Sequence, residues 1–288
     1  MHGTHRIVKK SRLSEEVFRI EVEAPLIARE RKAGQFVIVQ YDDEYSERIP
    51  LTIADADPER GTVTLIFQTV GATTHRLALK NPGDEIIILG PLGNPTHIEK
   101  HGWAVCVGGG IGLAPLHPIA KALKEAGNRV TVISGARTRD LLIMQEELSA
   151  IADEHIVVTD DGSFGRKALV TEPLKELCQR VPPPDIVVAI GPPIMMKFCA
   201  ETTRPFGVHT LVSLNTIMID GTGMCGGCRV AVDGKVKFVC VDGPEFDGHK
   251  VDWEGMMSRL SAYKDQEKEA HERCHLELQL EALRESAQ

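Results

Sequence analysis

One stretch rich in cysteine and glycine, residues 220–240, constrains this 288-residue chain more than any other. Cys225 and Cys228 form a C-x2-C pair, eleven residues separate Cys228 from Cys240, and Asp220 precedes the first thiol by five positions. Thiolates at C-x2-C spacing hold a metal ion or an iron–sulfur cluster, and the intervening glycines let the backbone turn tightly around it. The chain must therefore fold so that this loop closes on its own thiols.

The residues after the loop predict how it closes. Residues 229–239 have the pattern of two short strands joined by Asp233-Gly234, which is typical of a tight hairpin turn. The hairpin would return Cys240 to the loop. The spacing favours a [2Fe–2S] cluster over a zinc knuckle, because zinc usually takes four Cys or His ligands. Zinc is the main alternative, and a redox-active C-x2-C pair is a weaker one.

Length and composition exclude several classes of protein. A chain of 288 residues predicts two or three domains, and a net charge of −8 argues against binding to nucleic acid or to an anionic membrane. The chain contains no run of about 18 apolar residues, so no transmembrane helix is predicted, and its N-terminus is too polar for a secretory signal. Three of the seven cysteines are clustered, which does not indicate a disulfide framework. We expect a cytoplasmic protein.

Residues 5–98 show short alternating apolar runs separated by turn residues, which predicts a small β-barrel. Two polar loops lie within it. Residues 48–52 place Arg48 and Thr52 at the start of a strand, and residues 68–74 end in Thr73 and Thr74 before a short helix. A helix N-terminus of this kind suits a pyrophosphate. The alternative is that one threonine only caps the helix.

From Trp103 the pattern becomes strand, glycine-rich turn and helix, repeated as far as residue 203. Residues 104–115 run from a buried strand into four glycines, but their spacing departs from G-x-G-x-x-G. The context is that of a dinucleotide-binding βαβ unit, and the alternative is a tight turn in an ordinary α/β domain. Ligands of such sheets lie beyond the carboxyl ends of the strands. That rule brings together residues 108–112, 135–139, 160 and 191–193.

The chain after Pro244 is helical in pattern. An apolar face is predicted by Trp253, Met256, Met257, Leu260 and Tyr263, and the residues beyond it are mostly charged. This tail is either a helix packed on its own domain or an arm that binds a partner. The spacing of residues predicts no nucleophile–base pair anywhere in the chain.

The order of a barrel with an Arg…Thr loop, a Gly-Gly-Gly-Ile-Gly-Leu-Ala-Pro turn and a terminal Cys-rich lobe resembles a known family. It is similar to the ferredoxin–NADP⁺ reductase-like flavoproteins that end in a [2Fe–2S] lobe. Two branches fit: the electron-transfer subunit of class 1B dihydroorotate dehydrogenase, and the small subunit of NADH-dependent reduced ferredoxin:NADP⁺ oxidoreductase, an electron-bifurcating enzyme. The resemblance covers residues 5–265.

The cluster loop separates the two branches. The dihydroorotate-type subunits have Cys-x4-Cys-x2-Cys and a later fourth Cys, whereas this chain has Asp220 in place of the first Cys. One aspartate with three cysteines, and the segment 238–249, resemble the bifurcating branch. The resemblance implies a cluster with Asp220, Cys225, Cys228 and Cys240 as ligands.

The resemblance also implies which residues bind the other cofactors. FAD would lie against the barrel, with the ring near Pro50, Leu51 and Thr52. Its remaining neighbours would be Arg48, Ile66, Phe67, Gln68, Gly71, Thr73 and Thr74. Arg48 stands two residues before Pro50, one more than in relatives, because Ile49 intervenes. NAD(H) would bind at Gly109, Gly110, Ile111, Gly112, Arg137, Asp160, Gly191, Pro192 and Pro193.

The expected fold is thus a β-barrel FAD domain (1–98), an α/β nucleotide-binding domain (99–210), a [2Fe–2S] lobe (211–248) and a helical tail (249–288). The expected function is electron transfer between NAD(H), FAD and the cluster, in a heterodimer with a larger flavoprotein and iron–sulfur subunit. The complex would also transfer electrons to ferredoxin. The dihydroorotate branch is the alternative, and a zinc-stabilised binding module without redox activity is another. NADP(H) is an alternative nucleotide, because arginines follow the second α/β strand.

Overall fold

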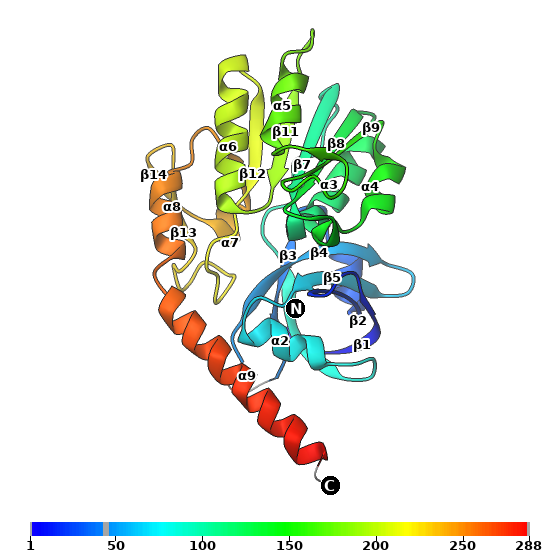
Figure 1. Cartoon of the computed structure of the whole chain (residues 1–288), viewed down its shortest axis with the longest axis vertical. Helices are drawn as coiled ribbons and strands as arrows, with labels where there is room; N and C mark the ends of the chain where they lie inside the picture. The colour runs from blue at the N-terminus through cyan, green and yellow to red at the C-terminus, as the bar shows by residue number, and fades with distance from the viewer. Residues whose placement is uncertain (1, 43–45, 287–288) are drawn as a thin grey trace.

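The computed structural model describes residues 2–42 and 46–286. A closed barrel, an α/β domain and a small hairpin lobe lie side by side, and a long helix follows the lobe. Figure 1 shows the α/β domain above the barrel and the lobe at the left, next to both. The expected order of a barrel, an α/β domain and a terminal lobe is confirmed.

The barrel closes because six amphipathic strands pair in the order β1-β2-β5-β4-β3-β6. They are β1 His2–Arg12, β2 Val17–Glu23, β3 Phe36–Gln40, β4 Ile49–Asp57, β5 Thr62–Gln68 and β6 Glu85–Leu92. Two helices, α1 Pro25–Glu30 and α2 Ala72–Leu79, cover its ends. Ile20, Leu65 and Phe67 are fully buried in its core, as alternation along a strand requires.

The α/β domain is a seven-stranded sheet in the order β10-β9-β8-β7-β11-β12-β15. The strands are β7 Trp103–Gly109, β8 Arg129–Ala136, β9 Glu154–Thr159, β10 Arg166–Lys167, β11 Ile186–Ile190, β12 His209–Ser213 and β15 Glu245–Asp247. All neighbours are parallel except β15, which pairs antiparallel with β12. This edge strand comes from the chain that follows Cys240, so the segment after the cluster loop returns to the sheet.

Helices cover both faces of this sheet. α3 Leu113–Glu125 and α4 Gln145–Ile151 pack on one face, and α5 Thr171–Cys178 and α6 Pro193–Thr203 pack on the other. Successive residues of β7 alternate between the two cores: Cys106 faces α3, and Val107 faces α6. Cys106 and Cys199 are both buried in these cores.

The lobe contains the expected hairpin, β13 Arg229–Val232 and β14 Lys235–Phe238. Asp233 and Gly234 join the strands with φ values of 53° and 69°, which is the backbone of a type I′ turn. A single turn of helix, α7 Val239–Asp242, follows and holds Cys240.

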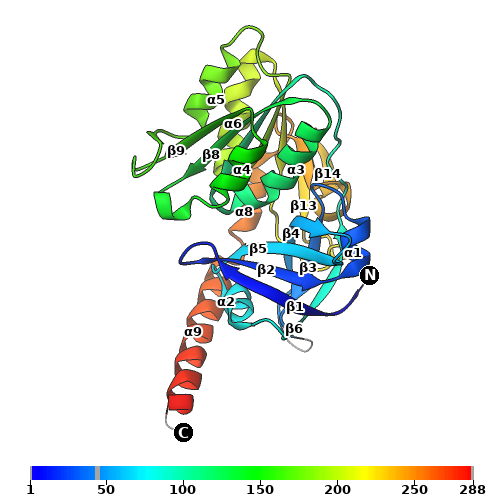
Figure 2. The ribbon, with the colours of Figure 1, turned by 90° about the vertical axis from the view of Figure 1, so that its right-hand side faces the viewer.

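The tail forms two helices, α8 Trp253–Leu260 and α9 Lys264–Ser286. Trp253 and Met256 are buried against the lobe as expected, whereas Tyr263 lies beyond the end of α8 and is 56% exposed. Helix α9 crosses α2 and extends past the barrel (Figure 2). Among the described residues, no helix is both long and apolar enough to cross a bilayer.

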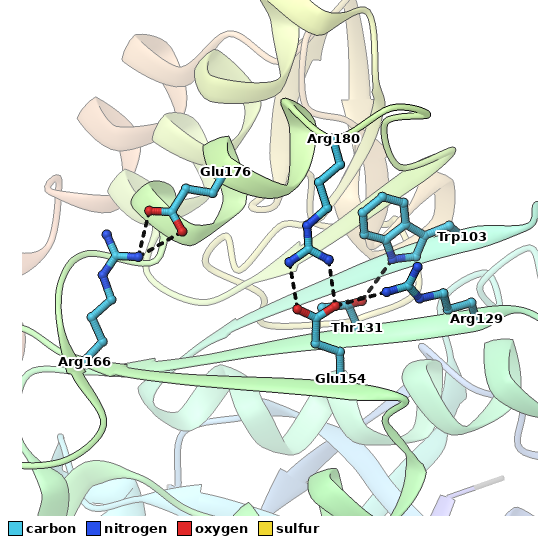
Figure 3. Close-up of polar contacts among 7 residues, drawn as sticks. All are labelled: Trp103, Arg129, Thr131, Glu154, Arg166, Glu176 and Arg180. Carbon is cyan, nitrogen blue, oxygen red and sulfur yellow. Dashed lines mark hydrogen bonds and ion pairs between the residues drawn. The ribbon is translucent and has the colours of Figure 1, made fainter.

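A paired cluster of charges fixes the amino ends of the central strands (Figure 3). Arg180 donates two hydrogen bonds to Glu154, at 2.8 and 2.9 Å, and Arg129 donates a third at 3.2 Å. The guanidinium groups of both arginines lie over the ring of Trp103, 4.8 and 5.7 Å from its centroid. The indole nitrogen of Trp103 donates to Thr131 at 2.9 Å. Every polar group drawn at this edge of the sheet has a partner.

Candidate functional site

A cavity of about 990 Å³ lies where the barrel meets the carboxyl edge of the α/β sheet. The barrel contributes β4 and β5, and the sheet contributes the loops after β7, β8, β9 and β11. Fifteen of the residues predicted to bind FAD or nicotinamide line it: Pro50, Leu51, Thr52, Ile66, Phe67, Gln68, Thr74, Gly109, Gly110, Ile111, Gly112, Arg137, Asp160, Gly191 and Pro192. Residues from distant parts of the sequence therefore meet at one site.

Close packing of backbone explains the glycines of this cavity. A Cβ on Gly112 would lie 2.3 Å from the carbonyl oxygen of Ile190, a distance that the backbone cannot relieve. Gly112 therefore lets the start of α3 approach the end of β11. Gly110 is different: its φ of +56° is in the left-handed region, but a Cβ there would meet open space. The turn thus needs glycine for space at one position and for conformation at another.

Arg137 and Asp160 enter the cavity as free charges. Both line it from the ends of β8 and β9, and neither side chain has a hydrogen bond or ion pair among the described residues. The nearby charged residues Arg139 and Asp161, in contrast, have partners within the chain. The guanidinium of Arg139 lies 5.6 Å from the ring of Phe164, and the carboxylate of Asp161 accepts from the Ser163 amide and hydroxyl at 2.9 and 2.7 Å.

Four predicted residues lie outside the lining of the cavity: Arg48, Gly71, Thr73 and Pro193. Arg48 is exposed and donates to the Gln40 side chain at 3.3 Å. Gly71 is the N-cap of α2, and Pro193 begins α6. The roles of these four residues stay predictions.

The two threonines of α2 have partners within the chain. The hydroxyl of Thr74 accepts from the amides of Val70 and Gly71 at 3.0 and 3.1 Å, so it caps the helix while facing the cavity. Thr73 is buried and donates to Glu47 at 3.1 Å. Thr73 would reach a phosphate only if the Glu47 carboxylate moved.

The sequence did not identify several cavity residues. Met195 and Phe198 on α6, and Ser213 and Asn215 at the end of β12, also line it. A signal existed for the last two, because they follow the carboxyl end of a sheet strand, where ligands of such folds bind. Nothing in the sequence around Met195 and Phe198 distinguishes them from core residues of an amphipathic helix.

The cysteine-rich loop folds against the barrel beside this cavity. Gly221 has a φ of +81°, and a Cβ there would lie 2.8 Å from the side chain of Ile38 on β3. Within the lobe, the sulfurs of Cys228 and Cys240 are both buried and 3.2 Å apart. Cys225 is exposed and accepts from the amide of Gly227 at 3.4 Å.

The Asp220 carboxylate is held at the mouth of the loop. It accepts from the Thr222 hydroxyl and amide at 2.5 and 3.0 Å and from the Met224 amide at 3.2 Å. These bonds, the Thr222 hydroxyl first, lower the pKa of the Asp220 carboxyl, and the charge of Arg48 adds to the effect. The Gly227 amide lowers the pKa of Cys225, while the nearby charge of Asp220 opposes this shift.

The arrangement of these four side chains fits a two-iron cluster. They lie as a pair of buried sulfurs and, nearer the surface, a carboxylate beside a thiol. A [2Fe–2S] cluster spreads four ligands over two irons, and loop amides hydrogen-bond its sulfurs.

Two family models match the chain. Residues 106–201 match the oxidoreductase NAD-binding domain, and residues 215–252 match the iron–sulfur cluster binding domain of dihydroorotate dehydrogenase B. The second match spans the cysteine-rich loop, the hairpin and β15. The first spans the glycine turn and the loops that line the cavity.

Curated relatives cover nearly the whole chain. A dihydroorotate dehydrogenase B electron transfer subunit homolog from Thermotoga maritima is 52% identical over 95% of this chain and 97% of its own length. The dihydroorotate dehydrogenase B electron transfer subunit of Geobacillus kaustophilus is 34% identical over 87% and 99%.

Solved structures agree with this assignment. A structure of NADH-dependent reduced ferredoxin–NADP oxidoreductase, solved to study flavin-based electron bifurcation, is 51% identical over 93% of this chain and 97% of its own, with a TM-score of 0.88. The cytochrome b5 reductase domain of Ulva prolifera nitrate reductase, 17% identical over 72% and 94% with a TM-score of 0.60, shares the fold. These matches support FAD, a [2Fe–2S] cluster and NAD(H) as cofactors. The chain belongs to the family of dihydroorotate dehydrogenase B electron transfer subunits and their homologues, and it is an oxidoreductase subunit that transfers electrons.

Proposed function

We propose that this chain is the small subunit of an electron-bifurcating NADH-dependent reduced ferredoxin:NADP⁺ oxidoreductase. The observation that carries the proposal is the donor set of the loop, with Asp220 where dihydroorotate-type subunits have a cysteine. Sequence identity does not separate the branches, because the chain is 51% identical to the chain from the bifurcating oxidoreductase and 52% identical to the dihydroorotate dehydrogenase B homolog from T. maritima. The partner is then a larger flavoprotein and iron–sulfur subunit, and ferredoxin receives electrons through the complex.

In this proposal the barrel side of the cavity holds FAD. Pro50, Leu51 and Thr52 on β4, with residues 66–68 on β5, form the wall against the flavin ring. The N-terminus of α2, with Gly71 and the two threonines, faces the pyrophosphate, because unpaired helix amides attract anions. Arg48 would have to leave Gln40 to reach the same group.

The sheet side of the cavity holds the nicotinamide nucleotide. Gly109–Gly112 bring backbone amides to the pyrophosphate, and residues 191–193 close the pocket opposite them. Asp160 is free to accept from a ribose hydroxyl, which favours NAD(H) over a nucleotide that carries a 2′-phosphate. Hydride transfer between nicotinamide and flavin needs orientation and exclusion of water but no acid–base residue, in agreement with the apolar lining.

The lobe holds the cluster in this proposal. Cys228 and Cys240 would ligate the buried iron, and Asp220 with Cys225 would ligate the outer one. Bound flavin would exchange a hydride with nicotinamide and single electrons with the cluster. An oxygen ligand is harder than sulfur, so Asp220 gives the cluster a potential different from that of an all-cysteine cluster. We assign the four domains as residues 1–98, 99–210, 211–248 and 249–288.

Spectra of the anaerobically purified chain test the cofactors and the ligand together. We expect a flavin absorbance band and a reducible [2Fe–2S] EPR signal, whose shape or midpoint potential changes in Asp220→Cys. Asp242→Asn is the matched control, because this carboxylate pairs with Lys237 and the amide of Phe238 rather than facing the loop thiols. A cluster unaffected by residue 220 would remove Asp220 as a ligand, and bound zinc without sulfide would refute the electron-transfer role.

The second candidate is the electron-transfer subunit of dihydroorotate dehydrogenase, which the cluster-domain match at residues 215–252 favours. Activity of the native complex, isolated through a tag on this chain, separates the two. The bifurcating role predicts that NADPH reduces NAD⁺ and ferredoxin together, one electron pair divided between the two routes. Reduction of NAD⁺ by dihydroorotate would instead establish the second candidate.

A further inference from the structure

A carboxyl group that the proposed mechanism does not use lies behind the cavity. Glu245 is on β15, directly opposite Ser213 on β12, and follows Pro244 in the chain. Both Ser213 and Pro244 line the cavity. Residues directly opposite each other in an antiparallel pair face the same side of the sheet, so the Glu245 side chain and that of Ser213 share a face.

The other side of Glu245 faces a second opening. The carboxylate accepts from the hydroxyl of Thr96 at 2.6 Å, in the segment that links the barrel to the α/β domain. Thr96 lines a separate groove of about 700 Å³ between residues 31–33, α3 and this linker. Glu245 therefore lies between Ser213, which lines the cavity, and Thr96, which lines a groove open to solvent.

The packing around this carboxyl is tight. A Cβ on Gly34 would lie 2.2 Å from the Thr96 hydroxyl and 2.8 Å from the Glu245 carboxylate. Gly34 has a φ of +85° and is held by the hydrogen bond from the Thr96 amide to the preceding carbonyl of Ala33, at 2.9 Å. Glycine at this position leaves room for the threonine and the glutamate to meet.

No charged side chain in the part of the chain that the structure describes pairs with the carboxylate. The elements around it carry Arg31, Lys32, His97 and His209, and Asp247 lies on its own strand; none of them forms a hydrogen bond or ion pair with it. Arg31 pairs with Asp55, and His97 with Glu99. Burial raises the pKa of the Glu245 carboxyl to about 7, and the hydrogen bond from Thr96 opposes the shift.

We propose that Glu245 is a redox-linked proton site, which takes a proton from the solvent groove when the cavity gains negative charge and releases it when that charge leaves. The inference rests on the proposed binding of flavin in the cavity. A hydride carries two electrons and one proton, so its transfer from NADH would leave anionic reduced flavin and NAD⁺, and the cavity keeps one net negative charge once NAD⁺ has left. A proton bound from solvent at the Glu245 carboxylate balances that charge. When the flavin has passed both electrons to the cluster, the proton that came with the hydride and the proton on Glu245 both return to solvent.

Proton uptake during reduction tests the proposal in the holoprotein, with FAD and cluster bound. The flavin is reduced electrochemically through mediators in weakly buffered solution, and the protons consumed are counted with a pH indicator. Above the carboxyl pKa of about 7, wild type should take up as much as one proton more per flavin than Glu245→Gln. Below it the difference should vanish, because the carboxyl is already protonated before reduction.

Two further variants separate this role from a structural one. Thr96→Val keeps the carboxyl but removes the hydrogen bond that favours its charged form, so the same uptake should shift to higher pH. This variant also tests the proposal if Glu245→Gln does not fold. Asp247→Asn removes a charge from the same strand and should leave uptake unchanged.

Equal proton uptake by wild type and Glu245→Gln at pH 8 would overturn the proposal, as would the same loss in Asp247→Asn. Electrochemical reduction does not depend on the nucleotide. A chain whose flavin is reduced at the electrode but not by NADH would refute the proposed function and still test Glu245. A chain that binds no flavin would refute both.

Discussion

The two edges of the α/β sheet hold their charged side chains in opposite states. At the amino edge, Glu154 is bound by two arginines that also cover Trp103, so every charge has a partner (Figure 3). At the carboxyl edge, Arg137 and Asp160 face a cavity with no partner among the described residues. The paired edge stabilises the fold, and the unpaired edge is free to bind a ligand.

The two edges differ in how much of the interaction energy of their charges remains for a ligand. A charge without a partner contributes nothing to folding and keeps its full capacity to interact with a ligand, whereas a paired charge has already used that capacity. Substitutions at the amino edge should therefore change stability and leave ligand binding unaltered. Substitutions at the carboxyl edge should change binding more than stability, except where the backbone itself is tightly packed.

The largest effect is expected at that exception. Gly112→Ala would place a methyl group 2.3 Å from the carbonyl oxygen of Ile190, and neither backbone segment can move cheaply. We expect a loss of about 3 kcal/mol in the free energy of unfolding, together with loss of bound flavin. Thermal unfolding and FAD content measure both. Gly110→Ala, which meets only a conformational penalty, should cost about 1 kcal/mol.

The next effect concerns nucleotide preference. Asp160→Ala removes a free carboxylate that would repel a 2′-phosphate, so affinity for NADP(H) relative to NAD(H) should rise tenfold or more, about 1.4 kcal/mol. Binding to the holoprotein, followed by titration calorimetry, measures the ratio. Asp161→Asn is the control, since its carboxylate binds Ser163 instead of facing the cavity. An unchanged ratio of NADP(H) to NAD(H) affinity in Asp160→Ala would contradict the view that the free charges of the carboxyl edge bind the ligand.

A smaller effect is expected at the amino edge. Arg180→Ala removes a two-point ion pair with Glu154 and a cation–π contact with Trp103, both partly open to solvent. The loss of stability should be about 1 kcal/mol. Urea unfolding measures it, and affinities for FAD and NADH serve as the internal control, because they should not change. A change in either affinity would show that the edges are coupled.

The smallest effect is the pH dependence of this pair. The hydrogen bond from Arg180 holds the pKa of the Glu154 carboxyl below its usual 4.5 in the folded chain. A lowered carboxyl pKa adds stability above the unfolded value, and this stability is lost as pH falls through the folded one. The difference in unfolding free energy between wild type and Arg180→Ala should therefore be constant from pH 7 to 5 and shrink below about pH 4.5.

Local patterns in the sequence were sufficient for most of the fold. Alternating apolar runs predicted the barrel, and the strand–glycine–helix repeat predicted the parallel sheet, because both patterns follow from which faces must be buried. Asp233-Gly234 predicted its hairpin for a still more local reason, since few residues adopt two consecutive positive φ values.

The places where distant segments meet emerge only once the chain has folded. The thiol loop, the glycine turn and the polar residues at the ends of the strands can be recognised in the sequence, because they depend on spacing within a few residues. The sequence did not predict that Thr73 donates to Glu47, that Arg48 lies away from the cavity, or that β15 returns to the sheet and places Glu245 beside Thr96. The contacts of Thr73 with Glu47 and of Thr96 with Glu245 join residues 26 and 149 positions apart, and no local pattern encodes such a distance.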